Sequence, residues 1–170
     1  MKESWKTRIV RCGFNLFPAF RGTGARVIYI AGDYSEIRIK LPLNWRTRNY
    51  VGTIFGGSMY GAVDPIYMYM FLKMLGNDYI VWDKAASIRF KKPGKSTLYA
   101  TFKITYEELD EVKRALEGKR SLDRVYDVEL VDESGTVHAV VEKTIYIRKK
   151  DRESNPSSGH VVSLPKSESK

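Results

Sequence analysis

One carboxylate inside an apolar stretch is the strongest candidate for chemistry in this sequence. Asp64 lies within residues 59–75, where most other residues are aliphatic, aromatic or methionine. Burying a carboxylate without partners is costly, so Asp64 must gain hydrogen bonds or take part in a site. Two interpretations stay open at this point. Asp64 is either a catalytic carboxylate or a structural one that binds backbone groups or a neighbouring Arg or Tyr.

A pair of glycines just before this stretch offers a second element of a reaction site. Gly56 and Gly57 precede an expected helix, where free backbone N–H groups and the helix dipole favour an incoming oxygen anion. Such a pair would serve as an oxyanion hole, although helix entry alone also explains two glycines. Pro65, directly after Asp64, removes one helical hydrogen bond and predicts a kink in the helix.

Basic residues gather at two places that an anionic group could reach. Arg89, Lys91 and Lys92 lie at or just beyond the end of an expected strand, and Arg46 and Arg48 lie in the loop before the helix. The net charge of +9 favours acidic partners such as nucleic acid, anionic lipid or the phosphates of coenzyme A. Each cluster could equally be an ordinary solvated face. No nucleic-acid-binding motif accompanies the charge, so nucleic acid is not expected as a partner.

These positions require a helix that is surrounded by other parts of the chain. Residues 59–75 are apolar on nearly every side, which is typical of a buried helix or a membrane span. The run is short for a bilayer and contains Asp64 and Lys73, so we expect burial and no stable membrane insertion. Ser58 is the expected helix cap.

The rest of the chain predicts a curved antiparallel sheet of about six strands around that helix, an α+β fold. Apolar residues at helical spacing predict a short surface helix over 107–118 and a cover helix over 4–17. The cover helix is expected to pack on the sheet, and a membrane surface is the alternative. Runs rich in β-branched and aromatic residues predict the strands. The expected strands are residues 26–30, 36–41, 79–91, 97–106, 124–132 and 137–148.

Length and composition predict a single domain over residues 1–149. With 170 residues, 43% of them hydrophobic, the chain can bury one substantial core. The single cysteine, Cys12, excludes an intrachain disulfide, and the first residues do not read as a signal peptide, so a cytoplasmic location is the default. Polar and basic residues predict a flexible basic tail over 150–170.

The segments that carry these residues resemble the hotdog-fold thioesterases, in particular the phenylacetic-acid-pathway branch of the 4-hydroxybenzoyl-CoA thioesterase-like superfamily. The resemblance runs from Asn49 through Gly57 to Asp64, and again over residues 85–94. The chain is still more similar to an uncharacterised family of hotdog thioesterase-like proteins that carry the same Phe-Gly-Gly and Val-Asp-Pro sequences. The resemblance covers most of residues 25–148 and implies the hotdog fold.

The resemblance also implies hydrolysis of an acyl thioester, such as acyl-CoA, at a site shared between subunits. Gly57 N–H would polarise the thioester carbonyl, and Asp64 of the partner subunit would act as a base on water or as a nucleophile. Asn49 would hold the water or the substrate. The chain would form a homodimer or a dimer of dimers, and would need no metal and no cofactor besides the coenzyme A of its substrate. The candidate substrate-binding residues are Phe55, Gly56, Tyr60, Tyr67, Met68, Arg89, Lys91 and Lys92.

One residue departs from the thioesterase pattern. The similar enzymes have His before the Gly-Gly pair, whereas this sequence has Phe55, and its only histidines are His138 and His160. An imidazole from the loop is therefore not available. This keeps open a second function, a non-catalytic acyl- or lipid-binding hotdog protein in which Asp64 is structural. The missing His also argues against a hotdog dehydratase.

Overall fold

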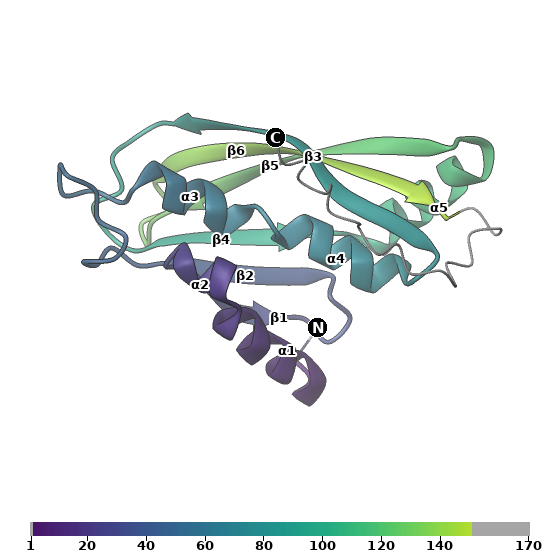
Figure 1. The fold of residues 1–170 in the computed structure, drawn as a ribbon, viewed down its shortest axis with the longest axis horizontal. Helices are drawn as coiled ribbons and strands as arrows, with labels where there is room; N and C mark the ends of the chain where they lie inside the picture. The colour runs from purple at the N-terminus through teal and green to yellow at the C-terminus, as the bar shows by residue number, and fades with distance from the viewer. Residues whose placement is uncertain (1, 151–170) are drawn as a thin grey trace, which may run out of the picture.

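A six-stranded antiparallel sheet forms the body of the protein (Figure 1). The computed structural model describes residues 2–150, and the tail expected over 150–170 lies almost entirely outside them. Every expected strand is present, although β4 is shorter than expected and β5 starts three residues earlier. The spatial order is β1-β2-β4-β5-β6-β3. The strands are β1 (Arg26–Ile30), β2 (Glu36–Leu41), β3 (Tyr79–Phe90), β4 (Leu98–Lys103), β5 (Ser121–Val131) and β6 (Val137–Lys149).

The strand order places β3 at one edge of the sheet. It pairs with β6 from Tyr79 opposite Lys149 to Phe90 opposite Ala139, with a bulge between Asp83 and Ala85. Among residues 2–150, no strand pairs with the outer side of β3. An edge strand of 12 residues is long, and such edges invite pairing with another chain.

Two helices, α3 (Gly56–Val63) and α4 (Ile66–Leu75), cross the inner face of the sheet where one long helix was expected. The break at Pro65 confirms the predicted kink. The expected cap was wrong, because Phe55 occupies the N-cap position and Ser58 lies inside the first turn. The backbone is already helical at the two glycines, and Ser58 N–H donates to Phe55 O at 3.0 Å.

The core lies between the two central helices and the inner face of the sheet. Val63, Ile66 and Phe71 are fully buried, and Ile37 and Ile39 alternate with exposed or half-buried residues along β2. This alternation points every second side chain at the helices. Burial of these aliphatic and aromatic groups is the main favourable contribution to folding.

The N-terminal cover helix is present as α1 (Trp5–Leu16), followed by the short α2 (Pro18–Gly22). Asn15 fixes it to the edge strand, since its amide donates to Val27 O at 2.9 Å and its oxygen accepts from Val27 N at 2.8 Å. The apolar residues of this segment do not all face the core. Val10 and Phe14 pack against the core, whereas an outer set is exposed. The exposed set comprises Trp5, Ile9, Leu16 and Phe17.

The predicted surface helix in the connection between β4 and β5 is confirmed as α5 (Tyr106–Gly118). The Thr105 hydroxyl caps it by accepting from Glu108 N–H at 3.1 Å. Leu109, Val112 and Leu116 are buried, as their helical spacing predicts. No described helix has the length and apolar character needed to cross a membrane.

Candidate active site

Asp64 lies at the break between α3 and α4, where a lysine from β6 holds it. Lys143 Nζ donates to Asp64 Oδ1 at 2.6 Å. The Lys143 side chain is 1% exposed, whereas that of Asp64 is 41% exposed. Of the partners expected for a structural Asp64, a tyrosine is present, because the Tyr60 side chain interacts with the carboxylate, whereas the buried Lys143 was not expected. The carboxylate is anchored by a buried cation and remains accessible on its other side.

A second carboxylate completes this cluster. Asp83 Oδ1 lies 2.9 Å from Lys143 Nζ. At this distance the two groups form an ion pair. Strand alternation explains the placement, because Lys143 occupies an inward position of β6 between Val141 and Ile145. One buried cation thus faces two carboxylates.

Burial and the charges of this cluster shift the pKa values of its groups. Burial opposes the charged form of Lys143, but its contacts with Asp64 and Asp83 outweigh burial and raise the pKa of Lys143. Burial raises the pKa of Asp83, and Lys143 opposes that rise. Burial and the neighbouring Asp64 raise the pKa of Tyr60, whose ring centre lies 5.6 Å from Lys143 Nζ. Lys143 is therefore charged and Tyr60 neutral at physiological pH.

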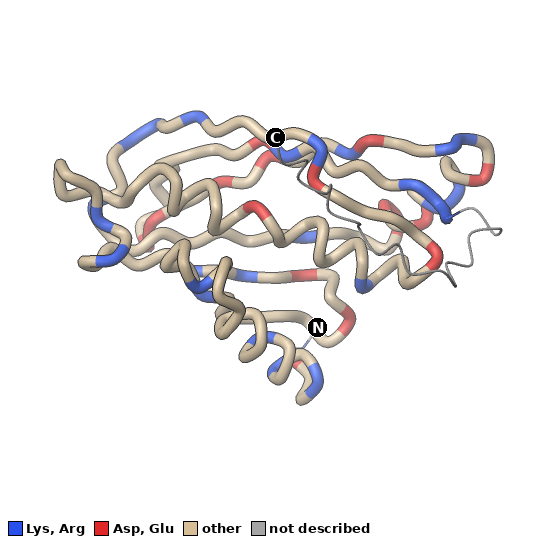
Figure 2. Tube along the Cα trace, in the orientation of Figure 1, with Lys and Arg blue, Asp and Glu red and all other residues tan. Residues whose placement is uncertain are grey.

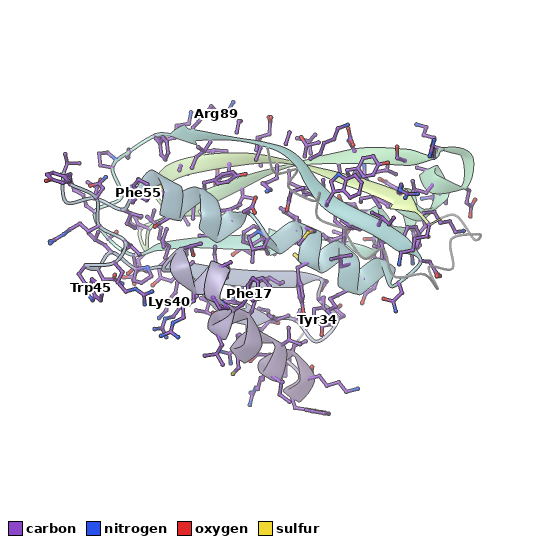
Figure 3. All side chains as sticks on the ribbon, viewed as in Figure 1. Phe17, Tyr34, Lys40, Trp45, Phe55 and Arg89 are labelled. Atoms are coloured by element: carbon purple, nitrogen blue, oxygen red, sulfur yellow. The ribbon has the colours of Figure 1, made fainter. Side chains whose placement is uncertain are left out.

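The start of α3 presents two open backbone donors. Within residues 2–150, neither the Gly56 N–H nor the Gly57 N–H has a hydrogen-bond acceptor. Aromatic rings lie against both glycines: a Cβ at Gly56 would come within 2.7 Å of the Phe90 ring, and one at Gly57 would overlap the Phe55 ring. Phe55 is 57% exposed at this position (Figure 3). Only glycine fits beside these rings without displacing them.

Asn49 shapes the loop that leads into α3. Its amide nitrogen donates to Thr53 Oγ1 at 2.9 Å. Its oxygen accepts from the backbone N–H groups of Val51 at 3.1 Å and Thr53 at 3.0 Å. Both ends of the amide are therefore used inside the loop. This explains the type of residue at position 49 without a substrate.

A cavity of about 370 Å³ lies beside the start of α3. It brings together Asn49 and Gly56 with Lys91 and Lys92 from the segment that follows β3. Figure 2 shows basic residues in the loop before α3 and around the end of β3. Arg89 is not part of the cavity lining and points away from α3 (Figure 3).

A larger cavity of about 740 Å³ lies between the N-terminal helices and the central helix pair. Asp64 and Met68 line it. The candidate residue Tyr67 does not, because it is buried and stacks on Tyr126 at 4.0 Å between ring centres. Burial raises the pKa of Tyr67 to about 12. Tyr67 is therefore part of the core.

The imidazole of His138 has a structural role in this fold. His138 is buried, with Nδ1 3.0 Å from Pro93 O and Nε2 3.0 Å from Asp132 Oδ2. It joins the turn between β5 and β6 to the segment after β3. His160 lies outside the described residues. In the described part of the chain, no group of three His, Cys, Asp or Glu residues is placed to hold a metal ion.

Comparison with known proteins identifies a family and a fold. The sequence pattern of a family described as a domain of unknown function, DUF4442, matches residues 6–147. No curated protein sequence matches the chain significantly. Solved structures do match, and they establish the hotdog fold that the sequence predicted.

Three of these structures illustrate the similarity. A Pseudomonas aeruginosa protein of unknown function, described as a probable thioesterase, has a TM-score of 0.76 and 16% identity over 88% of this chain and 100% of its own. A Haemophilus influenzae thioesterase has a TM-score of 0.63 and 14% identity over 87% of this chain and 94% of its own. A Chlorobaculum tepidum protein of unknown function has a TM-score of 0.68 and 16% identity over 85% of this chain and 95% of its own.

Proposed function

Because the chain belongs to the DUF4442 family and has the hotdog fold, we propose that it hydrolyses acyl thioesters such as acyl-CoA at a site shared between two subunits. The observation that carries the proposal is the Asp64 carboxylate, which the buried Lys143 fixes while much of its side chain stays accessible. A fixed, accessible carboxylate is what activation of water or direct nucleophilic attack requires. A thioesterase among the proteins that share this fold supports the same chemistry.

The distance between the two catalytic elements favours a second subunit. Gly57 and Asp64 are seven residues apart on the helix pair, which corresponds to a rise of about 10 Å. An attacking group must come within about 3–3.5 Å of the carbonyl carbon. Asp64 therefore cannot reach a thioester carbonyl that is bound at the Gly57 of its own chain. Asp64 of the partner subunit would have to act on that carbonyl.

The edge strand β3 offers a way to bring two copies together. Pairing of β3 with β3 of a second copy would continue the sheet and cover the open edge. A twofold axis across that pairing would generate two identical sites, each built from both subunits. We therefore propose a homodimer as the active unit. A dimer of dimers would preserve these two sites.

The proposed reaction uses this geometry in a balanced sequence. A water oxygen attacks the thioester carbon while Asp64 of the partner subunit accepts a water proton. The Gly57 N–H stabilises the oxyanion of the tetrahedral intermediate. Collapse of the intermediate breaks the carbon–sulfur bond, and the thiolate takes the proton from the Asp64 carboxyl group to give free coenzyme A and a carboxylic acid. Direct attack by Asp64 would instead break the carbon–sulfur bond, release the coenzyme A thiolate and form an acyl anhydride. Water then hydrolyses the anhydride to the carboxylic acid and the Asp64 carboxyl group, which passes its proton to the thiolate.

The basic residues near the smaller cavity suit the phosphates of coenzyme A. Lys91 and Lys92 line that cavity together with Gly56 at the helix start. A thioester carbonyl at Gly57 would leave the coenzyme A part on this basic side. In this proposal coenzyme A is part of the substrate, and the reaction uses no other cofactor.

A second candidate function is non-catalytic binding of an acyl group. The large cavity and the aromatic residue at position 55 favour it, since neither requires turnover. Release of free thiol from acyl-CoA discriminates the two functions. A binding protein would take up the same ligands without releasing thiol.

Complementation between two inactive variants tests whether the site is shared. Gly57→Pro removes the N–H donor in the first helical turn and displaces the exposed Phe55 ring, which lies 2.3 Å from an added Cβ, and Asp64→Asn removes the carboxylate. We expect each variant alone to be inactive. Refolding them together should return about one quarter of the wild-type activity, because about half of the dimers would be mixed and each would hold one intact site.

Native mass spectrometry would count the mixed dimers in the complementation experiment. Circular dichroism would verify that each variant folds. Mixed dimers without activity would contradict a site built from Gly57 of one subunit and Asp64 of the other.

Restoring an imidazole at position 55 should raise turnover. Phe55 is exposed and lies against Gly57, so Phe55→His places a hydrogen-bond donor beside the proposed carbonyl site at little cost in stability. We expect kcat to rise about tenfold or more, with a new inflection of the pH profile near pH 6.5, the usual titration range of His. Phe55→Leu is the matched control and should show neither effect. Equal kinetics for the two variants would place Phe55 away from the reacting carbonyl.

A further inference from the structure

The larger cavity is lined by parts of the chain that lie far apart in sequence, and it is open to solvent on one side. In Figure 1 the α1–α2 pair lies beside the central helix pair, and the cavity of about 740 Å³ lies between them. Gly61 allows the close approach, because a Cβ there would lie 2.9 Å from Thr23 Cγ2. Cavities that hold small organic ligands typically span about 300–1,000 Å³. The space is therefore large enough for a ligand.

The lining of this cavity selects an apolar ligand. Its walls are mainly aliphatic and aromatic, and among residues 2–150 Asp64 is the only charged residue in the lining. Phe14 makes edge-to-face contacts with Phe20 at 4.8 Å and with Tyr69 at 5.2 Å, so the aromatic wall is well packed. Ordered water needs two to four polar partners, which such walls do not provide.

The position of Asp64 selects the kind of apolar group. A neutral thioester can place its carbonyl beside the carboxylate, whereas a free carboxylate there would be repelled. The unbranched chain of an acyl thioester meets both requirements, because it is apolar along its length and uncharged at its reactive end. Hydrolysis creates a carboxylate at this point, and repulsion by Asp64 would then favour release of the product.

We infer that the cavity between α1–α2 and α3–α4 receives the acyl chain of the substrate, in the subunit that contributes Asp64. The inference deepens the proposed function and rests on it for the link to hydrolysis. The acyl chain would pass Asp64 into this cavity, while coenzyme A stays at the partner subunit's start of α3. The N-terminal helices thereby set the chain length that the enzyme accepts.

Filling the cavity from α1 tests this assignment. Gly13 lines the cavity, and a Cβ at this position would meet no atom within 4 Å, so Gly13→Leu projects into open space. Leucine also favours the helix over glycine. Gly22→Leu is the matched control, because Gly22 has equally open surroundings but does not line the cavity. Ala19→Met would fill the cavity from α2 if Gly13→Leu failed to fold.

The measurement is titration calorimetry with two non-hydrolysable thioethers, S-butyl-CoA and S-decyl-CoA. We expect the wild type to bind the decyl compound more tightly, by about fourfold for each additional methylene that enters the cavity. Gly13→Leu should remove this advantage and leave the butyl compound unaffected, whereas Gly22→Leu should change neither. A chain-length advantage that survives in Gly13→Leu, or that is absent in the wild type, would overturn the inference.

A neutral ligand without coenzyme A separates the two proposals. Decanol should bind the wild type and Asp64→Asn, and it should bind Gly13→Leu more weakly. Decanol binding with this pattern, together with no thioether binding and no turnover, would retain the acyl cavity and reject the thioesterase. Turnover of acetyl-CoA and decanoyl-CoA at equal rates in the wild type and Gly13→Leu would reject the cavity and retain the thioesterase.

Discussion

Asp64→Asn should reduce the turnover of acyl-CoA by about 10²–10⁴-fold while leaving the protein folded, because a general base typically contributes an effect of this size. Asparagine has nearly the same shape as aspartate, and its side-chain oxygen can still accept from Lys143. The lost activity would then reflect the missing carboxylate and not a rearranged site. Release of free thiol from short, aromatic and long-chain acyl-CoA substrates would measure it.

Asp127→Asn is the control for this experiment. Asp127 is an exposed carboxylate on β5 that lines neither cavity, so its removal changes the net charge equally and should leave kcat unchanged. Turnover that survives in correctly folded Asp64→Asn would remove Asp64 from the reaction. Absence of turnover in the wild type on every substrate would favour the acyl-binding function.

Local sequence patterns were sufficient to predict most elements of the fold, although not the short helix α2. A stretch that is apolar on all sides predicts a buried helix, and alternating residues such as Ile37 and Ile39 predict a strand with one face in water. The effect of Pro65 is also local, because proline removes a hydrogen bond within its own helix. The resemblance to hotdog thioesterases then added the arrangement of these elements.

Contacts between distant residues could not be predicted in the same way. Lys143 and Asp64 are 79 residues apart, and no spacing rule joins them. A signal was nevertheless present. Lys143 interrupts the inward positions Val141, Ile145 and Ile147 of a strand, where a charged residue requires a buried partner. This pattern would have identified the lysine, although not which carboxylate it contacts.

The two cavities also depend on packing that the sequence does not encode locally. The helical spacing of the cover helix does not show which of its apolar residues pack inward: Val10 and Phe14 do, while Trp5 and Ile9 remain exposed. Helical spacing alone does not distinguish two apolar faces from one broad face. The cavity beside Asp64 depends on which apolar residues of α1 pack inward, so it can be recognised only in the folded structure.

Lys143→Met should lower the free energy of unfolding at neutral pH by about 3 kcal/mol, the lower end of the range for breaking a buried ion pair. Methionine preserves most of the side-chain volume but leaves Asp83 without its cation, and Asp64 loses its anchor. The lower end applies because the exposed carboxylate of Asp64 can turn towards water. Against a typical total stability of about 5–15 kcal/mol, such a loss is large.

Urea unfolding would measure this loss, and a double variant provides its control. Lys143→Met combined with Asp83→Asn removes the orphaned charge, so it should recover a large part of the lost stability. No recovery would mean that the cost of Lys143→Met arises from packing and not from an unpaired carboxylate. Lys84→Met is a matched single control, since Lys84 forms an exposed ion pair with Asp123 and should cost about 1 kcal/mol or less.

The pH dependence of the unfolding free energy tests this cluster, because the pKa shifts of Lys143 and Asp83 each predict the direction in which stability changes with pH. Lys143 has a raised pKa, so its contribution to wild-type stability is complete below its unfolded value of 10.5 and is lost as pH rises through the folded value. Asp83 also has a raised pKa, so it favours the folded state below the unfolded value of 3.8, and this contribution is lost as pH rises through the folded value.

Removal of Lys143 should raise the pKa of Asp83 further, since the opposing contact disappears. The difference in unfolding free energy between wild type and Lys143→Met should therefore be largest at neutral pH and shrink towards about pH 4, as Asp83 becomes protonated in the folded variant. A difference that stays constant from neutral to acidic pH would show that Asp83 does not depend on Lys143 for its charge. In that case the role of Lys143 would be to position Asp64. Lys143→Met would then lower kcat by more than its loss of folded protein explains.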